Sequence, residues 1–333
     1  MHLQIHNNSS LVNGSFGMIN RRLLRIKVLQ ELYAHLYAED RSLEASEKEL
    51  QLSIQRSYDL YYYLILLLVE VRNYARHKIE QAKEKLIPAW DDLHPNTRFI
   101  DNAIIVQIDD NPFLQKYVSD HKIGWSNYPE LIRHTYIDLT QTELFKNYMA
   151  SPTGGYETDK TFAISLFTDF FQNSEMLAQH LEEQSIFWND EVDYVFSMIV
   201  KSIHSFTEEK GSTTPLMKMY RNEEDKSFGS LLLHKTILNR DEYLSLVDQF
   251  CKNWDLERIA FIDKLILILA ISEAIEFPFI PTRVTMNEYI DIAKLYSTQQ
   301  SGTFVNGLLD KIFQYLKDQN RIVKKGKGLI GEL

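Results

Sequence analysis

The sequence predicts an all-α fold, and three observations support this. Only 12 glycines and 8 prolines occur among 333 residues, about half the usual share, so turn-rich β folds lack their usual turn residues. Apolar residues recur every three or four positions over long stretches, which is the helical period. With 44% hydrophobic residues, the chain can bury a sizeable core and is long enough for roughly two domains of about 150 residues.

The first predicted helix lies in residues 18–40. Residues 1–17 show no periodicity, no basic start and no long apolar stretch, so they fail as a signal peptide and we expect a disordered extension. Met18 is the expected functional start. From Asn20, a plausible N-cap, to Tyr37, helical spacing is kept by Leu24, Val28, Leu29, Leu32 and Leu36.

Residues 41–225 are predicted to be mostly helical. A long helix is expected from about Arg56 to Leu86, since Pro88 ends it. Loops and short helices are expected between Pro88 and Pro129, where Asp, Asn and Pro interrupt the apolar runs. Helical patterns return over 129–149, 162–181 and 188–207.

Residues 226–320 have the most regular pattern. They predict five helices with short connections, packed as a compact bundle. Caps are expected at Asn239 or Asp241, at Asp255 and at Thr282. Residues 321–333 are basic and are expected to form a flexible tail.

Several classes of protein are disfavoured. The longest apolar runs are about half of the ~20 residues that a membrane helix needs, so no span is expected. The single cysteine, Cys251, excludes an intramolecular disulfide and fits a reducing, cytoplasmic location. Neither a phosphate-binding glycine loop nor an H-E-x-x-H motif is present. We therefore expect no enzymatic activity, no metal and no cofactor.

Cations at the start of the first helix indicate a local anion site. The net charge is −10, so nucleic-acid binding would need such a local basic patch. Arg21, Arg22 and Arg25 occupy the first two turns, where the helix dipole disfavours each cation by a few tenths of a kcal/mol. We expect these turns to overhang the bundle and to present three guanidiniums to phosphate. A solvated charged helix end is an equally open alternative.

The last predicted helix opens with a second candidate site, at residues 301–311. Gly307 inside a helix costs about 1 kcal/mol relative to Ala, which predicts close approach of another backbone. In the first turn, Phe304 could stack on an unpaired base and Asn306 could bond to a base edge. The alternative is that Phe304 belongs to the core and that Asn306 only starts the helix.

Two sets of motifs carry a family resemblance. The first is Arg21-Arg22-Leu23-Leu24-Arg25 followed by Gln30-Glu31-Leu32-Tyr33. The second is N-E-x-x-x-x-A-K, ending at Lys294, followed by F-V-N-G-x-L-D-K, starting at Phe304. Together they resemble the NusB family of bacterial transcription antitermination factors. The resemblance covers residues 18–38 and about 226–319, so residues 41–225 look like a large insertion.

The resemblance implies an all-α, NusB-like helical bundle without catalysis. It also implies binding of boxA-type single-stranded RNA with the ribosomal protein NusE, in the RNA polymerase antitermination complex on ribosomal RNA operons. The expected RNA-binding residues are Arg21, Arg22, Arg25, Phe304 and Asn306. The expected NusE-facing residues are Tyr33, Glu257 and Asp263, where acids suit a basic ribosomal protein.

Two departures and one alternative stay open. The family's usual basic residue before F-V-N-G is Thr303 here, and its usual acids just upstream are Gln299 and Gln300, which alters the RNA end. The alternative function is a helical protein–protein assembly scaffold in ribosome biogenesis, acting through residues 41–225. Its candidate interface anchors, for which core packing is the competing role, are Tyr61, Tyr62, Tyr63, Trp90, Trp125 and Trp188.

Overall fold

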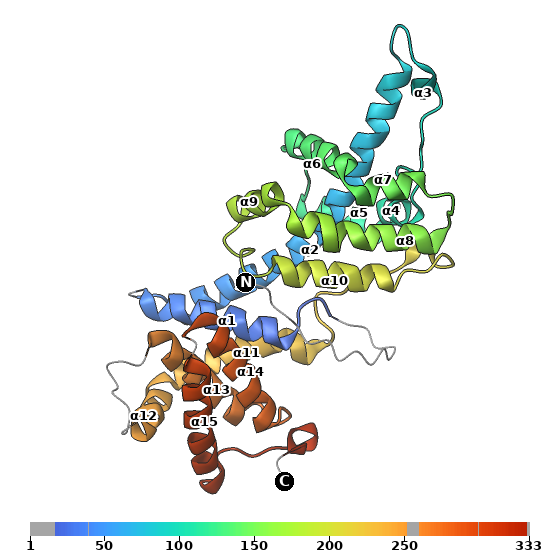
Figure 1. Cartoon of the computed structure of the whole chain (residues 1–333). Coiled ribbons are helices and arrows are strands. Elements are labelled where there is room, and N and C mark those ends of the chain that lie inside the picture. The colour runs from blue at the N-terminus through green and yellow to red at the C-terminus, as the bar shows by residue number, and fades with distance from the viewer. Residues whose placement is uncertain (1–16, 39, 252–259, 299, 332–333) are drawn as a thin grey trace. The chain divides into compact units, whose positions relative to one another are not determined.

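The computed structural model describes residues 17–331 except 39, 252–259 and 299, and the all-α prediction is confirmed (Figure 1). Within these residues one isolated bridge, Gly17 to Lys218, is the only strand-like pairing. None of the helices in these ranges is long and apolar enough to cross a membrane. The α-helices are α1 (Arg21–Tyr37), α2 (Leu43–Lys83), α3 (Trp90–Leu93), α4 (Ala103–Asp109), α5 (Pro112–His121), α6 (Pro129–Gln141), α7 (Glu143–Ala150), α8 (Tyr156–Ser165), α9 (Glu175–Gln184), α10 (Val192–His204), α11 (Glu223–Leu238), α12 (Arg240–Phe250), α13 (Phe261–Glu276), α14 (Thr282–Tyr296) and α15 (Ser301–Asp318).

The chain divides into two compact units. The accessory unit contains Gln55–Met219 together with Gly17 and Met18. The bundle unit contains Ile19–Ile54 and Tyr220–Leu333. Helix α2 begins in the bundle unit and continues into the accessory unit. It starts 13 residues earlier than the sequence pattern predicts, at Leu43, because its first turns are amphipathic and pack in the bundle, where Leu50 and Ile54 are buried.

The accessory unit has its own core, built around the apolar part of α2. Tyr61 shares a hydrogen bond of 2.6 Å with Ser202 of α10, and the indole of Trp125 donates to the carbonyl of Tyr63 at 3.0 Å. The Trp188 indole donates to the carbonyl of Arg56 at 2.8 Å. The candidate anchors buried in this way are Tyr61, Tyr62, Tyr63, Trp125 and Trp188. They are core residues, so only Trp90, which is 73% exposed, is available as an interface anchor.

Helix α13 is the centre of the bundle unit. Every residue from Leu265 to Ala274 is buried, as expected for a helix that is apolar on all sides. Around it pack α1, α11, α12, α14 and α15. Helix α1 begins as predicted, because the side chain of Asn20 accepts a hydrogen bond from the amide of Leu23 at 2.8 Å. The other expected caps differ: Asn239 and Pro281 precede α12 and α14 without a side-chain cap, and Asp255 lies outside the described residues.

Residues 321–333 are predicted to form a flexible tail. In the structure, part of this segment contacts the end of α13 and the residues that follow it. The ammonium of Lys324 donates to the carbonyls of Ala274 and Phe277 at 2.8 and 3.1 Å. A cation can donate to the free carbonyls at a helix C-terminus and is attracted to the negative end of the helix dipole. This explains the position of the Lys324 ammonium. Arg321 pairs with Glu242 of α12.

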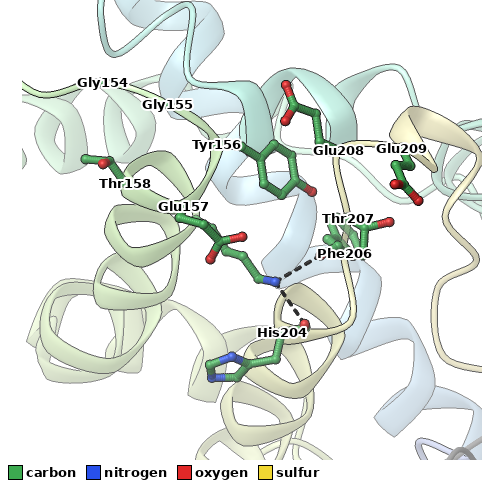
Figure 2. A pocket seen from close by; sticks show the side chains of 11 residues that line it. Gly154, Gly155, Tyr156, Glu157, Thr158, His204, Phe206, Thr207, Glu208 and Glu209 are labelled. Carbon is green, nitrogen blue, oxygen red and sulfur yellow. Dashed lines mark hydrogen bonds between the residues drawn. The ribbon is translucent and has the colours of Figure 1, made fainter.

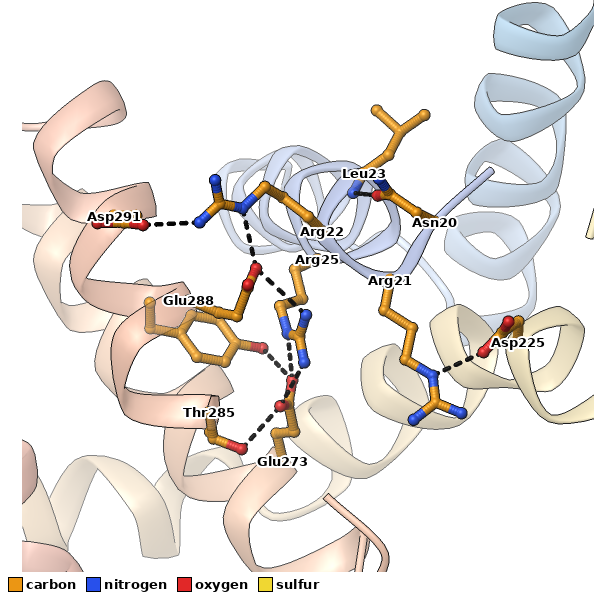
Figure 3. A network of polar contacts seen from close by, with 11 residues as sticks. Asn20, Arg21, Arg22, Leu23, Arg25, Asp225, Glu273, Thr285, Glu288 and Asp291 are labelled. Atoms are coloured by element: carbon orange, nitrogen blue, oxygen red, sulfur yellow. Dashed lines mark hydrogen bonds and ion pairs between the residues drawn. The ribbon is translucent and has the colours of Figure 1, made fainter. Parts of the chain in front are cut away.

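A buried ion pair joins α1 to the centre of the bundle (Figure 3). The guanidinium of Arg25 donates to both carboxylate oxygens of Glu273 on α13, at 2.7 and 2.8 Å. The same carboxylate accepts bonds of 2.8 Å from Thr285 and 3.2 Å from Tyr289, both on α14. Burial opposes the charge of Arg25, but the attraction and hydrogen bonding of Glu273 outweigh it, so the pKa of Arg25 is raised. One carboxylate thereby connects three helices.

Arg25→Ala should strongly destabilise the bundle unit. The substitution leaves the buried carboxylate of Glu273 without its cation, which costs about 3–5 kcal/mol in comparable buried pairs. Amide hydrogen exchange in α13 and α14 measures the loss. Arg21→Ala is the matched control from the same helix, because its partly exposed pair should contribute only about 0–1 kcal/mol. Equal losses in the two variants would contradict the assigned role of Arg25.

Candidate nucleic-acid interface

The two outer arginines of α1 also meet carboxylates of their own chain (Figure 3). Arg21 Nε lies 2.7 Å from Asp225 Oδ1, in the first turn of α11. Arg22 Nε lies 3.0 Å from Glu288 Oε2 and its Nη2 lies 2.7 Å from Asp291 Oδ2, both on α14. Partial burial opposes the charge of Arg22, but its hydrogen bonds and attraction to these two acids raise its pKa.

The expectation that α1 overhangs the bundle and presents three free guanidiniums is wrong. The first turns of α1 pack against α11, and their cations reach acids on α11, α13 and α14. These acids offset the unfavourable helix dipole. Arg25, whose side chain is 4% exposed, is a core residue and offers no donor to an outside ligand. Arg21 and Arg22 stay partly accessible, at 30% and 37% of their side-chain surface.

A chain of contacts leads from Arg22 to the first turn of α15. The ammonium of Lys294 lies 3.2 Å from Asp291 Oδ1, on the carboxylate that also binds Arg22. The aliphatic part of Lys294 crosses Gly302, where an added Cβ would come within 2.9 Å of Lys294 Cγ. A Cβ at Gly302 would therefore require the side chain of Lys294 to shift. The close approach predicted at Gly307 is wrong, since nothing would lie within 4 Å of a Cβ there.

The first turns of α15 expose part of the predicted RNA-facing set. Thr303 and Asn306 are exposed and Phe304 is half-buried. Asn306 lies one turn after Gly302 on the same side of the helix, while Val305, Leu308 and Leu309 form its buried face. We define the α14–α15 surface by its exposed or half-exposed residues. They are Lys294 of α14, Thr303, Phe304 and Asn306 of α15, and Arg22 of α1, which pairs with Asp291 of α14. Lys294 belongs to the family motif, but its place beside α15 could not be read from the motif's spacing.

The two described residues that are expected to face a protein partner, Tyr33 and Asp263, differ in exposure. Tyr33 is exposed, stacks on Tyr37 with ring centres 5.7 Å apart, and meets Phe261 edge-on at 5.6 Å. Tyr37 and Phe261 are exposed as well, and the i, i+4 spacing of the two tyrosines was the sequence signal for this patch. Glu257 lies outside the described residues.

Asp263 is not on the surface, so the prediction that it faces a partner is wrong. It is 5% exposed, in the first turn of α13. Its Oδ2 accepts a hydrogen bond of 2.9 Å from the hydroxyl of Ser301, the first residue of α15. The carboxylate thus lies near the positive end of α13 and fixes the start of α15.

The accessory unit has a shallow hollow between the loop at Gly154 and the end of α10 (Figure 2). Lys160 in its wall donates to the carbonyls of His204 and Phe206, both at 2.9 Å. Its ammonium therefore satisfies the C-terminal end of α10 and is not poised as a nucleophile. Among the described residues, no three His, Cys, Asp or Glu side chains come together to hold a metal ion.

Comparison with known proteins relates part of the chain to a family. The NusB family profile matches residues 192–314, which include α10 of the accessory unit as well as much of the bundle unit. The chain is 42% identical over 112 residues to a transcription antitermination protein NusB of Salinibacter ruber, covering 33% of this chain and 70% of that protein. The NusB proteins of Methylacidiphilum infernorum (40% over 100 residues, 30% and 68% coverage) and Chloroherpeton thalassium (36% over 105 residues, 32% and 50%) are similar too. No solved structure gives a significant match. Because the chain covers 70% of a NusB protein to which it is 42% identical, it belongs to the NusB family.

Proposed function

We propose that this protein is a cytoplasmic transcription antitermination factor that binds boxA-type single-stranded RNA together with NusE, within the RNA polymerase antitermination complex, and so supports transcription of ribosomal RNA operons. Its relatives carry the name transcription antitermination protein. The observation that carries the proposal is the α14–α15 surface, where Arg22 and Lys294 share the carboxylate of Asp291 and Lys294 lies against the first turn of the last helix.

On this surface the proposed roles differ from residue to residue. Arg22 and Lys294 contact phosphate, and Arg21 adds a cation at the other side of α1. Phe304 stacks on a base with its accessible edge, and Asn306 bonds to a base edge. Arg25 contributes by holding α1 against α13 rather than by touching RNA. Two or three phosphate contacts give only modest affinity, so a partner with further basic contacts should tighten binding.

We assign the NusE contact to the exposed rings of Tyr33, Tyr37 and Phe261, with Glu257 as an acidic neighbour in the sequence. Aromatic side chains anchor interfaces because they bury a large area at low entropic cost. Asp263 acts indirectly in this proposal, by fixing the start of α15 through Ser301.

Arg22→Ala should weaken binding of a short boxA-type RNA about tenfold, the loss expected for one charge-assisted contact. It should also reduce the magnitude of the log–log salt slope by about 0.7, because one phosphate contact to a single strand disappears. Fluorescence anisotropy titrations at several salt concentrations measure both quantities. Arg133→Ala is the control, since Arg133 is an exposed arginine of α6 paired with Glu130 at 2.7 Å. Unchanged affinity and slope for Arg22→Ala would remove this surface as the RNA site.

A second candidate function, protein assembly through the accessory unit, is favoured by one observation. The segment between α2 and the end of α3 carries four large apolar residues that are exposed: Leu86, Ile87, Trp90 and Leu93. Trp90 stacks on His94 with ring centres 3.8 Å apart. Clustered exposed apolar side chains typically mark interaction sites. We propose this segment, residues 86–93, as a protein contact that is independent of RNA.

Replacing Ile87 and Trp90 together by Ser should leave folding and RNA affinity unchanged, because exposed side chains contribute within about 0.5 kcal/mol. The double variant should lose a protein partner that co-purifies with the wild type after ribonuclease treatment. Ile186→Ser, at another exposed apolar position of the accessory unit, is the control and should retain that partner. The same set of partners for all three proteins would exclude segment 86–93 as a contact.

A further inference from the structure

We propose that Asp291, with Glu288 behind it, competes with RNA phosphate for the guanidinium of Arg22, so that the bundle unit limits its own affinity for RNA. This inference rests on the proposed function and adds a form of regulation to the same site. The donors that would hold a phosphate are engaged in the structure by carboxylates of the protein itself.

The contacts of Arg22 are the basis of this proposal (Figure 3). Nε and Nη2 form one edge of the guanidinium, the edge that grips an oxyanion with two parallel bonds. Here Nε donates to Glu288 at 3.0 Å and Nη2 donates to Asp291 at 2.7 Å. A phosphate that binds Nη2 must therefore displace Asp291, and one that grips the whole edge must displace Glu288 as well.

The two carboxylates are not equally easy to displace. Glu288 is the more buried of the two and also lies 3.4 Å from Nη1 of Arg25, which is fixed in the core. The side chain of Asp291 is 45% exposed and bonds otherwise to Lys294, which is exposed itself. Asp291 can therefore turn toward solvent while Glu288 stays in place. We therefore assign to Asp291 the role of the carboxylate that RNA phosphate displaces from Arg22.

The local charge balance leads to the same conclusion. Arg25 and Glu273 neutralise each other in the core. At the surface, Arg22 and Lys294 carry two positive charges, and Glu288 and Asp291 carry two negative ones. The site thus offers no net positive charge to phosphate until a carboxylate moves away. When the competent arrangement is populated only in part, the apparent affinity falls by that fraction.

The test is Asp291→Asn in the full-length chain, with titration of a short boxA-type RNA. Removing one competing charge from a partly exposed pair should tighten binding about two- to fivefold. In a background that carries both Arg22→Ala and Lys294→Ala, the same substitution should change the affinity less than about 1.5-fold, because both cations that pair with Asp291 are gone. Asp241→Asn, an exposed acid of α12 outside this network, is the control for the change in net charge.

Each outcome decides between specific explanations. Weaker binding by Asp291→Asn would mean that the carboxylate positions Arg22 for RNA, and unchanged binding would mean that it plays no part; either result overturns the proposal. Equal tightening with and without these two cations would reduce the effect to general repulsion of phosphate and would overturn the proposal too. If neither the wild type nor Asp291→Asn binds RNA at low salt, the proposed function itself fails. If the wild type binds RNA and Asp291→Asn binds it no more tightly, only the proposed competition is overturned, and the proposed function is not affected.

Discussion

The buried pair of Arg25 and Glu273 is the interaction on which the bundle unit depends. A carboxylate without any exposed surface is stable only if its charge and lone pairs are satisfied, and here one arginine, one threonine and one tyrosine satisfy them. The pair holds α1 against α13 and α14, and this position brings Arg21 and Arg22 to the acids of α11 and α14. The surface proposed for RNA is therefore a consequence of how the core is neutralised.

Matched charges are compatible with the proposed site for a polyanion on an acidic protein. Each arginine of α1 is balanced by carboxylates, so the proposed site would attract RNA only weakly until some of those contacts are exchanged for phosphate. The affinity for RNA would then depend on a second protein that binds with it, because a basic partner would add the positive charge that the bundle unit lacks. The exposed rings of Tyr33, Tyr37 and Phe261 are the separate surface that we propose for such a partner on the same unit.

The accessory unit has a core of its own, and its helix α10 lies within the stretch that matches the family profile. Its aromatic residues on α2 are occupied by internal hydrogen bonds and ring stacking, so they stabilise this unit instead of binding other molecules. Segment 86–93 is different because its apolar side chains have no core to enter. The two functional candidates therefore use different parts of the chain and can be separated by substitution.

Sequence alone determined the all-α class, the Asn20 cap and the family, because helical period, capping and motifs depend on neighbours within a few turns or on strings of identical residues. Tertiary structure decided which partners the charged residues pair with. Glu273 lies 248 residues after Arg25, and Asp291 lies 269 residues after Arg22, distances over which no local pattern reports pairing. The burial of Asp263 and the need for Gly302 likewise follow from contacts between α13, α14 and α15. Whether a cation at a helix start faces solvent or a carboxylate is set by the helices that pack around it.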